Sequence, residues 1–416
     1  MIVLIISHPL SHDSFINYLR KNEIDFIILN SGKKTESTID SIEVNQEIKC
    51  DLNNYKEVSS LCSELHNKFG FDIVLSHRDF TQYLAELISN HLSLPSRDLN
   101  SIKVLTHKYF MKHHFQKNGI KTAHFECMDL SLDFEKECER IESQIPYPFV
   151  IKPCNAVFSV GVVRVNNRDE FRKAYPKTKR VALLTQSFSR PETDKNYILI
   201  ESYIHGKEFN LDGFSINGKW HPLMLSEKYP DLHGPRFQEN ALVFHNKEIN
   251  KEFNDIANNL IDSLALPNSP FHIEIRQEYQ TGELYVVEAA PRLSGMGETI
   301  ECMINAASSF DLYQFFLRQR VQEPNLRLNV DYLSGSLEYE FVTGNGGTIT
   351  AFDGLDTITQ TRGFSKYRLF KSPGDYIAPS EYNFESVAIF YFSIENLESA
   401  MNVIELIDQN FKVIYE

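Results

Sequence analysis

Short apolar runs alternate with longer amphipathic segments through the first hundred residues. The runs IVLII at 2–6, DFIILN at 25–30 and DIVLS at 72–76 have the length and composition of buried strands, and the segments between them have helical periodicity. This alternation predicts βαβ units and a parallel sheet. No GxGxxG follows the first run, so the dinucleotide-binding fingerprint is absent and a purely structural layer is the plainer interpretation.

The pattern changes near residue 101. The segment SIKVLTHKYFMKHHFQKNGI is predicted as one helix closed by Gly119, because glycine readily adopts the left-handed conformation that ends a helix. A strand over 121–128, an amphipathic helix over 132–145 and a strand over 148–153 then predict the start of a second, α+β domain.

Longer strands of antiparallel character begin at residue 197. The runs 208–216 and 219–229 flank Asn217-Gly218, the strongest short-range signal for a hairpin, because both central residues of the turn need positive φ. A helix from about 247 to 265 leads to a second hairpin. Strands at 336–342 and 386–392, a helix at 395–408 and the closing run FKVIYE predict a small C-terminal α+β subdomain.

The second hairpin, HIEIRQEYQTGELYVVEAAPR at 272–292, places two acids opposite each other. If residues 280–282 form a three-residue loop with Gly282 in the left-handed position, Tyr279 pairs with Glu283 and Glu274 lies opposite Glu288. The same register sets Ile275 opposite Val287 and Ile273 opposite Ala289 on the apolar face, and a four-residue loop would break these matches.

Facing carboxylates destabilise a sheet unless a cation lies between them. Two interpretations stay open at this point. Arg276 and Arg292 are close in sequence and could neutralise the pair, or a hard divalent cation such as Mg²⁺, which prefers oxygen ligands, could bind both.

Further charged residues occupy strand ends. Lys152 lies in the apolar run PFVIKP, where a buried ammonium is costly without an anion, although it could also extend from the strand end into solvent. The following NAVFSVGVV is the place for a phosphate-covering turn, but Gly161 is its only glycine. In IESYIHGKEF, Glu201 and Glu208 flank a turn at Gly206, and each alone is equally typical of an exposed acid.

Composition narrows the class of protein. With 416 residues, 42% apolar and 24% charged, the chain is typical of a soluble globular protein of two or three domains. A net charge of −14 argues against a protein that coats nucleic acid. The six scattered cysteines form no metal or disulfide pattern, so we expect a reducing cytoplasm; the N-terminus lacks signal-peptide character, and no run approaches the ~20 apolar residues of a membrane span.

Together these motifs resemble the ATP-grasp superfamily, and within it the carboxylate-amine ligases that make dipeptides and related amides. The resemblance spans nearly the whole chain: the helix with Lys108, the strand VIKP, the segment IESYIHGKEF and the hairpin HIEI…VVEAAPR occur in the family order. It implies an α/β and α+β ATP-grasp fold, with a Rossmann-like pre-ATP-grasp domain at 1–100, a small lobe with its linking helix at 101–200, a large lobe with the metal site at 201–330 and a C-terminal α+β subdomain at 331–416.

The resemblance also implies roles for matching residues. Lys108 and Lys152 would hold the phosphates of ATP, with Ser159 and Gly161 in the covering loop. The adenine would be bound by the segment with Glu201, Tyr203 and Ile204, and the ribose by Glu208. The ligands of Mg²⁺, or of Mn²⁺ in its place, would be Glu274 and Glu288, and Arg292 would face the transferred phosphate and the acyl intermediate.

This sequence departs from the family at two places. Ala290 stands where an asparagine, a further oxygen ligand, is common. The loop after Lys152 carries Ala156, Val157 and Phe158 in place of most of the usual glycines.

The implied reaction is ATP-dependent amide formation. ATP converts a carboxylate into an acyl phosphate, and an amine then displaces phosphate, which leaves ADP and phosphate as the other products. The partners expected are a small acid and a small amine, above all amino acids, without nucleic acid or membrane; the sequence leaves a homodimer open.

Substrate recognition is assigned to charged residues near the acyl site. The segment SEKYPDLHGPRFQENALVF would fold over this site, which makes Arg236, Glu239 and Arg276 the candidates for binding the substrate. The alternative is that these three residues are ordinary charged side chains exposed to solvent. Two other functions stay open: an ATP-grasp step of purine or cofactor biosynthesis, and a nucleotide-binding regulator that has lost turnover.

Overall fold

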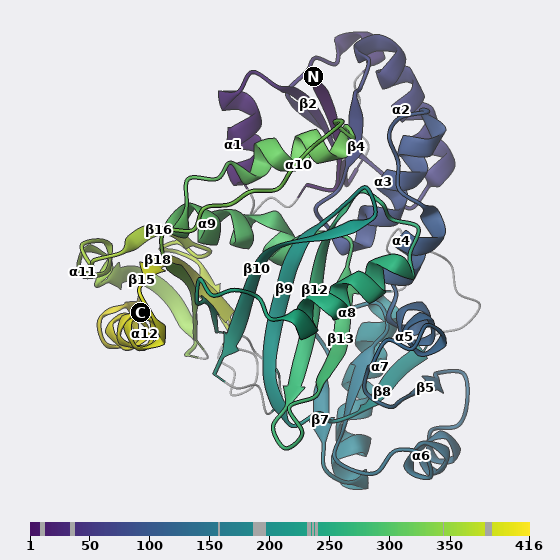
Figure 1. Cartoon of the computed structure of the whole chain (residues 1–416), viewed down its shortest axis with the longest axis vertical. Coiled ribbons are helices and arrows are strands. Elements are labelled where there is room, and N and C mark those ends of the chain that lie inside the picture. Colours follow the sequence, from purple (N-terminus) through teal and green to yellow (C-terminus); the bar gives the residue numbers. More distant parts are fainter. Residues whose placement is uncertain are drawn as a thin grey trace.

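The computed structural model describes residues 1–8, 13–33, 38–156, 159–185, 197–230, 234, 237, 240–343, 345–378 and 385–416. Figure 1 shows an N-terminal layer at the top, a large sheet in the centre, a smaller lobe at the lower right and the C-terminal elements at the left. Within the described ranges, no helix is long and apolar enough to cross a membrane. All six cysteines are unpaired thiols.

The N-terminal layer is a parallel sheet in the order β3-β2-β1-β4, which confirms the βαβ prediction. Apolar side chains cover both faces of β1: α2 and α3 pack on one face, and α1 and α10 pack on the other. The elements are β1 (Ile2–Ile6), α1 (Asp13–Lys21), β2 (Asp25–Ser31), η1 (Ile39–Ser41), β3 (Gln46–Cys50), α2 (Tyr55–Phe69), β4 (Ile73–Leu75), α3 (Asp79–His91) and, from later in the chain, α10 (Leu312–Arg320).

The single helix predicted from residue 101 is wrong, because the chain forms two helices, α4 (Leu99–Leu105) and α5 (Lys108–Lys117). His107 has an extended backbone between them, and its side chain accepts a hydrogen bond from the backbone N–H of Tyr109. A side chain that caps the next helix favours a break over a continuous helix. Lys108 therefore occupies the first position of α5, while Gly119, with φ +67°, follows its end.

The smaller lobe is an antiparallel sheet in the order β5-β8-β6-β7, with α6 and α7 against one face. Its apolar core combines strand residues such as Phe149 and Ile198 with helix residues such as Ile141 and Phe171. The elements are β5 (Phe125–Asp129), α6 (Phe134–Glu142), β6 (Phe149–Pro153), β7 (Val163–Val165), α7 (Arg168–Thr185) and β8 (Tyr197–Ser202).

The central sheet has eight strands in the order β13-β12-β9-β10-β11-β14-β18-β16. The hairpin predicted at Asn217-Gly218 is confirmed, with φ of 52° and 76° at these two residues. The strands are β9 (Gly206–Ile216), β10 (Lys219–Tyr229), β11 (Ala241–Phe244), β12 (Ser269–Glu278), β13 (Leu284–Ala290), β14 (Gly335–Thr343), β16 (Phe364–Leu369) and β18 (Glu385–Ile394).

The strands predicted for the C-terminal subdomain extend this central sheet, because β14 pairs with β11. The core near β14 also contains residues of a separate small sheet and of α12. The remaining elements are α8 (Lys251–Asp262), η2 (Ser294–Gly297), α9 (Glu298–Ala307), β15 (Gly347–Asp353), α11 (Leu355–Thr359), β17 (Tyr376–Ile377), α12 (Leu397–Asn410) and β19 (Lys412–Tyr415).

The register of the second hairpin agrees with the prediction at its far end and departs from it near the loop. Glu274 pairs with Glu288 and Ile273 pairs with Ala289, as predicted. Near the loop, however, Ile275 pairs with Val286, and the backbone N–H of Glu278 donates to Glu283 O, so the loop spans 279–282. A bulge at Val287 adds one residue to β13 and restores the register before Glu288.

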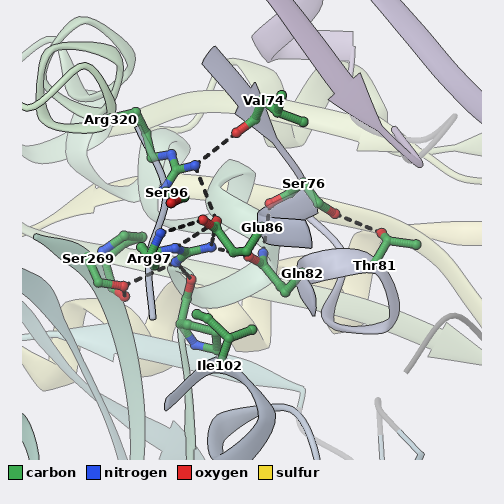
Figure 2. Close-up of polar contacts among 12 residues, drawn as sticks. Val74, Ser76, Thr81, Gln82, Glu86, Ser96, Arg97, Ile102, Ser269 and Arg320 are labelled. Atoms are coloured by element: carbon green, nitrogen blue, oxygen red, sulfur yellow. Dashed lines mark hydrogen bonds and ion pairs between the residues drawn. The ribbon is translucent and has the colours of Figure 1, made fainter. Parts of the chain in front are cut away.

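A buried polar network joins the N-terminal layer to the central sheet (Figure 2). Glu86 of α3 is fully buried and accepts two hydrogen bonds from Arg97, at 2.7 Å from its backbone N and 2.9 Å from Nε. Arg320, at the end of α10, lies 3.2 Å from the same carboxylate and donates to Val74 O of β4. Arg97 also donates to Pro291 O at 2.7 Å, so the network fixes the segment that follows β13.

Candidate functional site

The central sheet carries a row of polar side chains on one face. Alternate residues of a strand point to opposite faces. On β12, Phe271, Ile273 and Ile275 enter the apolar core, so His272, Glu274 and Arg276 lie on the other face. On the neighbouring strand β9 their register partners are Asp212, Asn210 and Glu208.

Cationic side chains compensate the facing carboxylates. Lys108 Nζ lies 2.8 Å from Glu288 Oε1, while Lys228 Nζ and His272 Nε2 lie 3.6 Å and 3.5 Å from Glu274 Oε1. Burial acts to raise the pKa of Glu274, but Lys228 and His272 outweigh it and hold this pKa well below its usual value. The carboxylate of Glu274 is therefore ionised at neutral pH.

The two arginines proposed to neutralise this pair have other partners. Arg276 shares the polar face with Glu274, but it donates to Gly206 O at 3.1 Å and lies 3.5 Å from Glu208. Arg292 forms a two-bond ion pair with Asp79, with Nε–Oδ1 and Nη2–Oδ2 distances of 2.9 and 2.8 Å. Asp79 is the first residue of α3, so this pair connects the N-terminal layer to the segment after β13.

Lys152 is buried in the smaller lobe, where Glu201 is its anion. Glu201 lies on the adjacent strand β8 and forms ion pairs with Lys152 and with Lys112, the latter at 2.6 Å. Burial acts to raise the pKa of Glu201, but the two lysines lower it to about 2. Burial lowers the pKa of Lys112 to about 8 despite the nearby carboxylate. The pKa of Lys152 is instead raised, because Glu201 outweighs the effect of burial.

Lys108 connects the smaller lobe to the hairpin. Besides its ion pair with Glu288, its Nζ donates to Ala156 O at 3.0 Å, and its backbone N–H donates to Cys154 O. The start of α5 therefore contacts both the residues that follow β6 and the carboxylate of Glu288.

Ser159 and Gly161 lie in the turn after β6, and both have positive φ, 52° and 80°. Thr178 of α7 donates to Gly161 O at 2.9 Å, which holds this turn against the helix. Val157 and Phe158, which precede the turn, lie outside the described residues.

The segment between β8 and β9 presents an aromatic ring. Two guanidinium groups lie near the ring of Tyr203, those of Arg164 and Arg276, at 5.1 and 5.3 Å from the ring centroid, distances at which a cation is attracted to the ring face. Ile204, the next residue, is half-buried.

Glu208 is buried. Its carboxylate lies 2.8 Å from Lys228 and 3.5 Å from Arg276. Arg236 and Glu239, the two substrate candidates in the loop after β10, lie outside the described residues.

A buried aspartate on β9, Asp212, contacts the histidine of this polar face. Asp212 is fully buried; it lies 3.3 Å from His272 Nδ1 and accepts a hydrogen bond from the backbone N–H of Ser294 at 2.6 Å. Although burial opposes it, Asp212 and Glu274 raise the pKa of His272 to about 9. Ala290 lies directly across from His272 on β13, so the position that lacks a polar side chain is paired with a polar residue.

Four residues of this cluster were missed by the sequence analysis: Asp79, Lys112, Asp212 and His272. Lys112 had a local signal, since it lies one helical turn after Lys108 and on the same face. Asp79, the first acid after the strand predicted at 72–76, was a weaker signal, because ligands of parallel sheets gather at the carboxyl ends of the strands. The only sequence signal for Asp212 and His272 is that each is a polar residue at an alternate position of a strand whose other residues are largely apolar.

The residues present fit a hard cation and a polyphosphate. Glu274 and Glu288 offer carboxylate oxygens on a face that also carries lysines, and their side chains are 26% and 27% exposed, so a ligand can reach them. No group of three His, Cys, Asp or Glu side chains suited to a metal forms within the described ranges. Mg²⁺ would suit this arrangement, because it commonly binds one or two carboxylates and completes its shell with phosphate oxygens and water.

Residues 145–300 match the family model of the ATP-grasp domain. A curated relative, the D-alanine–D-alanine ligase of Acetivibrio thermocellus, is 31% identical over 104 residues, which is 24% of this chain and 24% of the relative. The chain therefore matches about a quarter of the length of that relative.

Solved structures are similar along the whole chain. An L-amino acid ligase from Bacillus licheniformis has a TM-score of 0.83 at 19% identity and covers 100% of this chain and 98% of its own. Phosphoribosylglycinamide synthetase from Anaerococcus prevotii has a TM-score of 0.69 at 14% identity, with 100% and 99% covered. N5-carboxyaminoimidazole ribonucleotide synthetase from Thermotoga maritima has 0.67 at 16%, with 100% and 99% covered. At these identities the likeness establishes the fold that these proteins share.

Proposed function

We propose, on the premise that this chain carries an ATP-grasp domain in the ATP-grasp fold, that it is an ATP-dependent ligase that joins a carboxylic acid to an amine. A carboxylate is a poor electrophile at neutral pH. Transfer of the γ-phosphate of ATP to the carboxylate gives an acyl phosphate, and attack by the amine on the acyl carbon releases phosphate and forms the amide. The products are the amide, ADP and phosphate.

One observation carries this proposal: Glu274 and Glu288 face each other beside two lysines, Lys108 and Lys228, that come from separate parts of the chain. Phosphoryl transfer depends mainly on positioning and charge neutralisation. Mg²⁺, held by the two glutamates, would supply Lewis-acid neutralisation of the phosphate oxygens. Lys108, at the start of α5, and Lys152, in β6 of the smaller lobe, would bind the phosphates directly.

The lysines already have anionic partners in this structure, which bears on how phosphates would bind. Lys108 bonds Glu288 and Lys152 bonds Glu201, so each ammonium is held in place before a ligand arrives. Because Lys152 has a raised pKa, it stays fully ionised at neutral pH. A phosphate would then share these lysines with the carboxylates.

The nucleoside would lie along the segment between β8 and β9. The carboxylate of Glu201 is enclosed between two lysines, so the backbone of 201–204, together with the ring of Tyr203, is what this segment offers to adenine. Glu208 is held by Lys228, and a ribose hydroxyl would have to share that carboxylate.

Arg292 would face the transferred phosphate and the acyl intermediate. Burial acts to lower its pKa, but Asp79 outweighs burial and raises it, so the guanidinium keeps its charge. The ion pair with Asp79 uses Nε and Nη2, and Nη1 donates to the backbone oxygen of Leu293 at 3.1 Å, which fixes the direction of the guanidinium plane.

A phosphate-release screen over pairs of small acids and amines, with Mg²⁺-ATP, tests the proposal. Glu288→Gln should reduce turnover of any substrate found by about 10²-fold or more, the usual effect of losing one charge contact to a transition state. Glu283→Gln is the matched control, because Glu283 lies on the same hairpin and pairs with the half-exposed Lys121, away from the polar face. Full activity in Glu288→Gln would refute the metal assignment.

The screen also separates the other functions. Release of ADP only with a purine-pathway acid would place the enzyme in nucleotide biosynthesis. Tight binding of ATP without release of phosphate for any acid would instead identify a regulator.

A further inference from the structure

A pocket lies beside Arg292, between the N-terminal layer and the central sheet. Its walls come from the end of β4, from the segment 291–297 and from α10. The cavity volume is about 30 Å³ on a scale where one water needs about 10–15 Å³, so it holds two waters or a small group of similar size.

The sheet order places this pocket at a point where ligands commonly bind. The chain builds β1, β2 and β3 outward in one direction and then returns to add β4 on the other side of β1. In open parallel sheets, ligands bind outside the carboxyl ends of the strands at such a reversal. Ser76 and His77 lie directly after β4 and line the pocket, and His8, after β1, has its ring 6.1 Å from that of His77.

The pocket is mainly apolar. Leu75, Leu293, Leu312 and Phe316 line it, together with the ring of Tyr313. Phe316 also contacts the ring of His77, with 5.9 Å between centroids, which closes the pocket on the side of α10.

The floor offers little to a charged ligand. Gln82 and Arg97 line it, but Arg97 Nη2 donates to Gln82 Oε1 at 2.6 Å, and Gln82 Nε2 donates to Ser76 O at 2.7 Å. Arg320 also lines the pocket, but Arg97 and Arg320 both pair with Glu86. An ionised group placed here would lose its hydration and meet only arginines that already have an anionic partner, which is unfavourable.

We propose that this pocket receives the side chain of the carboxylic acid substrate, and that this acid carries a compact apolar side chain of about two or three carbon atoms. The inference rests on the ligase function proposed above and adds the class of acid. Arg292 lines the pocket and is also the residue proposed to face the acyl phosphate, so an acid with its carboxylate at Arg292 has its side chain at the pocket mouth. The N-terminal layer then contributes to specificity in addition to its structural role.

The proposal predicts a graded response to side-chain size. In a closed apolar pocket one added or missing methylene changes kcat/KM by about 10- to 200-fold. We expect kcat/KM to rise from glycine through alanine to 2-aminobutyrate or valine, to fall by at least about 10-fold for phenylalanine, and to be lowest for aspartate and lysine.

Variants of the pocket wall provide the decisive test. Phe316→Ala enlarges the pocket and should move the optimum to larger acids such as leucine or phenylalanine. Leu312→Phe fills the pocket and should move the optimum to glycine or alanine. Phe310→Ala is the matched control, because it also removes an aromatic ring near α10: the ring of Phe310 lies 5.7 Å from that of Phe315. Phe310 does not line the pocket, so the substrate optimum of this variant should not move. Circular dichroism and thermal denaturation check that each variant is folded.

The outcomes distinguish this inference from the function on which it rests. If acids stimulate phosphate release but the optimum stays the same in both wall variants, or if kcat/KM is the same across the series, the cavity holds only water and the pocket proposal falls while the ligase proposal stands. If Mg²⁺-ATP binds but no acid stimulates phosphate release, the ligase proposal falls and this inference falls with it.

Discussion

Replacing Glu201 with glutamine removes a charge that two buried lysines share. The carboxylate lies between Lys112 and Lys152 and is only 5% exposed. Glutamine keeps the shape of the side chain, so the variant isolates the effect of charge. It also mimics the protonated form of the native glutamate, which allows a direct comparison at low pH.

The magnitude follows from the pKa of Glu201. This pKa falls from 4.5 to about 2 in the folded protein. At about 1.4 kcal/mol per pH unit, the ion pairs contribute ~3 kcal/mol to the free energy of unfolding at pH 7. This agrees with the ~3–5 kcal/mol usually lost when one partner of a buried ion pair is removed.

The sign of the pH dependence is fixed by the direction of the shift. A carboxylate whose folded pKa is lowered contributes its full stability above the unfolded pKa and loses it as pH falls through the folded pKa. The difference in stability between wild type and Glu201→Gln should therefore be ~3 kcal/mol at pH 7, roughly 1.5 kcal/mol at pH 3, and close to zero near pH 1.

Urea unfolding at a series of pH values, followed by the fluorescence of Trp220, measures this difference. Trp220 is the only tryptophan, and it shares an apolar core with Met111 and Phe115, the neighbours of Lys112 on α5. Glu126→Gln on β5 is the control, because its carboxylate pairs with the half-exposed Arg140 and should change stability by less than about 1 kcal/mol. A difference for Glu201→Gln that stays constant from pH 7 to pH 3 would refute the reasoning.

Three further outcomes are expected. His272→Gln removes the ring that supports Glu274 and should weaken Mn²⁺ binding, measured by electron paramagnetic resonance without turnover, by about 10- to 100-fold; unchanged affinity would show that the carboxylate needs no such support. Glu86→Gln removes the carboxylate that Arg97 and Arg320 share in Figure 2 and should lower the free energy of unfolding by ~3–5 kcal/mol in urea titrations, whereas Glu135→Gln, on an exposed pair, should leave the midpoint unchanged. Gly206→Ala would place a β-carbon 1.8 Å from a backbone oxygen of β12, so we expect a clearly lower melting temperature, and an unchanged one would mean that the two strands can separate there.

The sequence determined the features that depend on near neighbours in the chain. The strand and helix pattern of the N-terminal layer and the turn at Asn217-Gly218 follow from periodicity and from turn chemistry. The pairing of Glu274 with Glu288 was also predicted, although from a loop one residue shorter than the observed one. The helix break at His107 escaped this kind of analysis, because the apolar pattern continues across it and only the capping side chain shows the interruption.

The hairpin shows where local information is insufficient. A three-residue loop and a four-residue loop followed by a bulge give the same pairing at Glu274 and Glu288, so the apolar alternation near the acids could not separate them. The difference lies in Val287, which has no partner in the ladder, and this choice is made by packing on both faces of the sheet.

Only the tertiary structure decided which charges meet. Lys108 reaches Glu288 across 180 positions, and Asp79 reaches Arg292 across 213. The sequence shows that an anion or a cation in a buried strand needs a partner, because desolvated charge is costly. It cannot show which partner, since that depends on how separate sheets and helices pack, and packing brings distant residues together through shape and burial that no local pattern encodes.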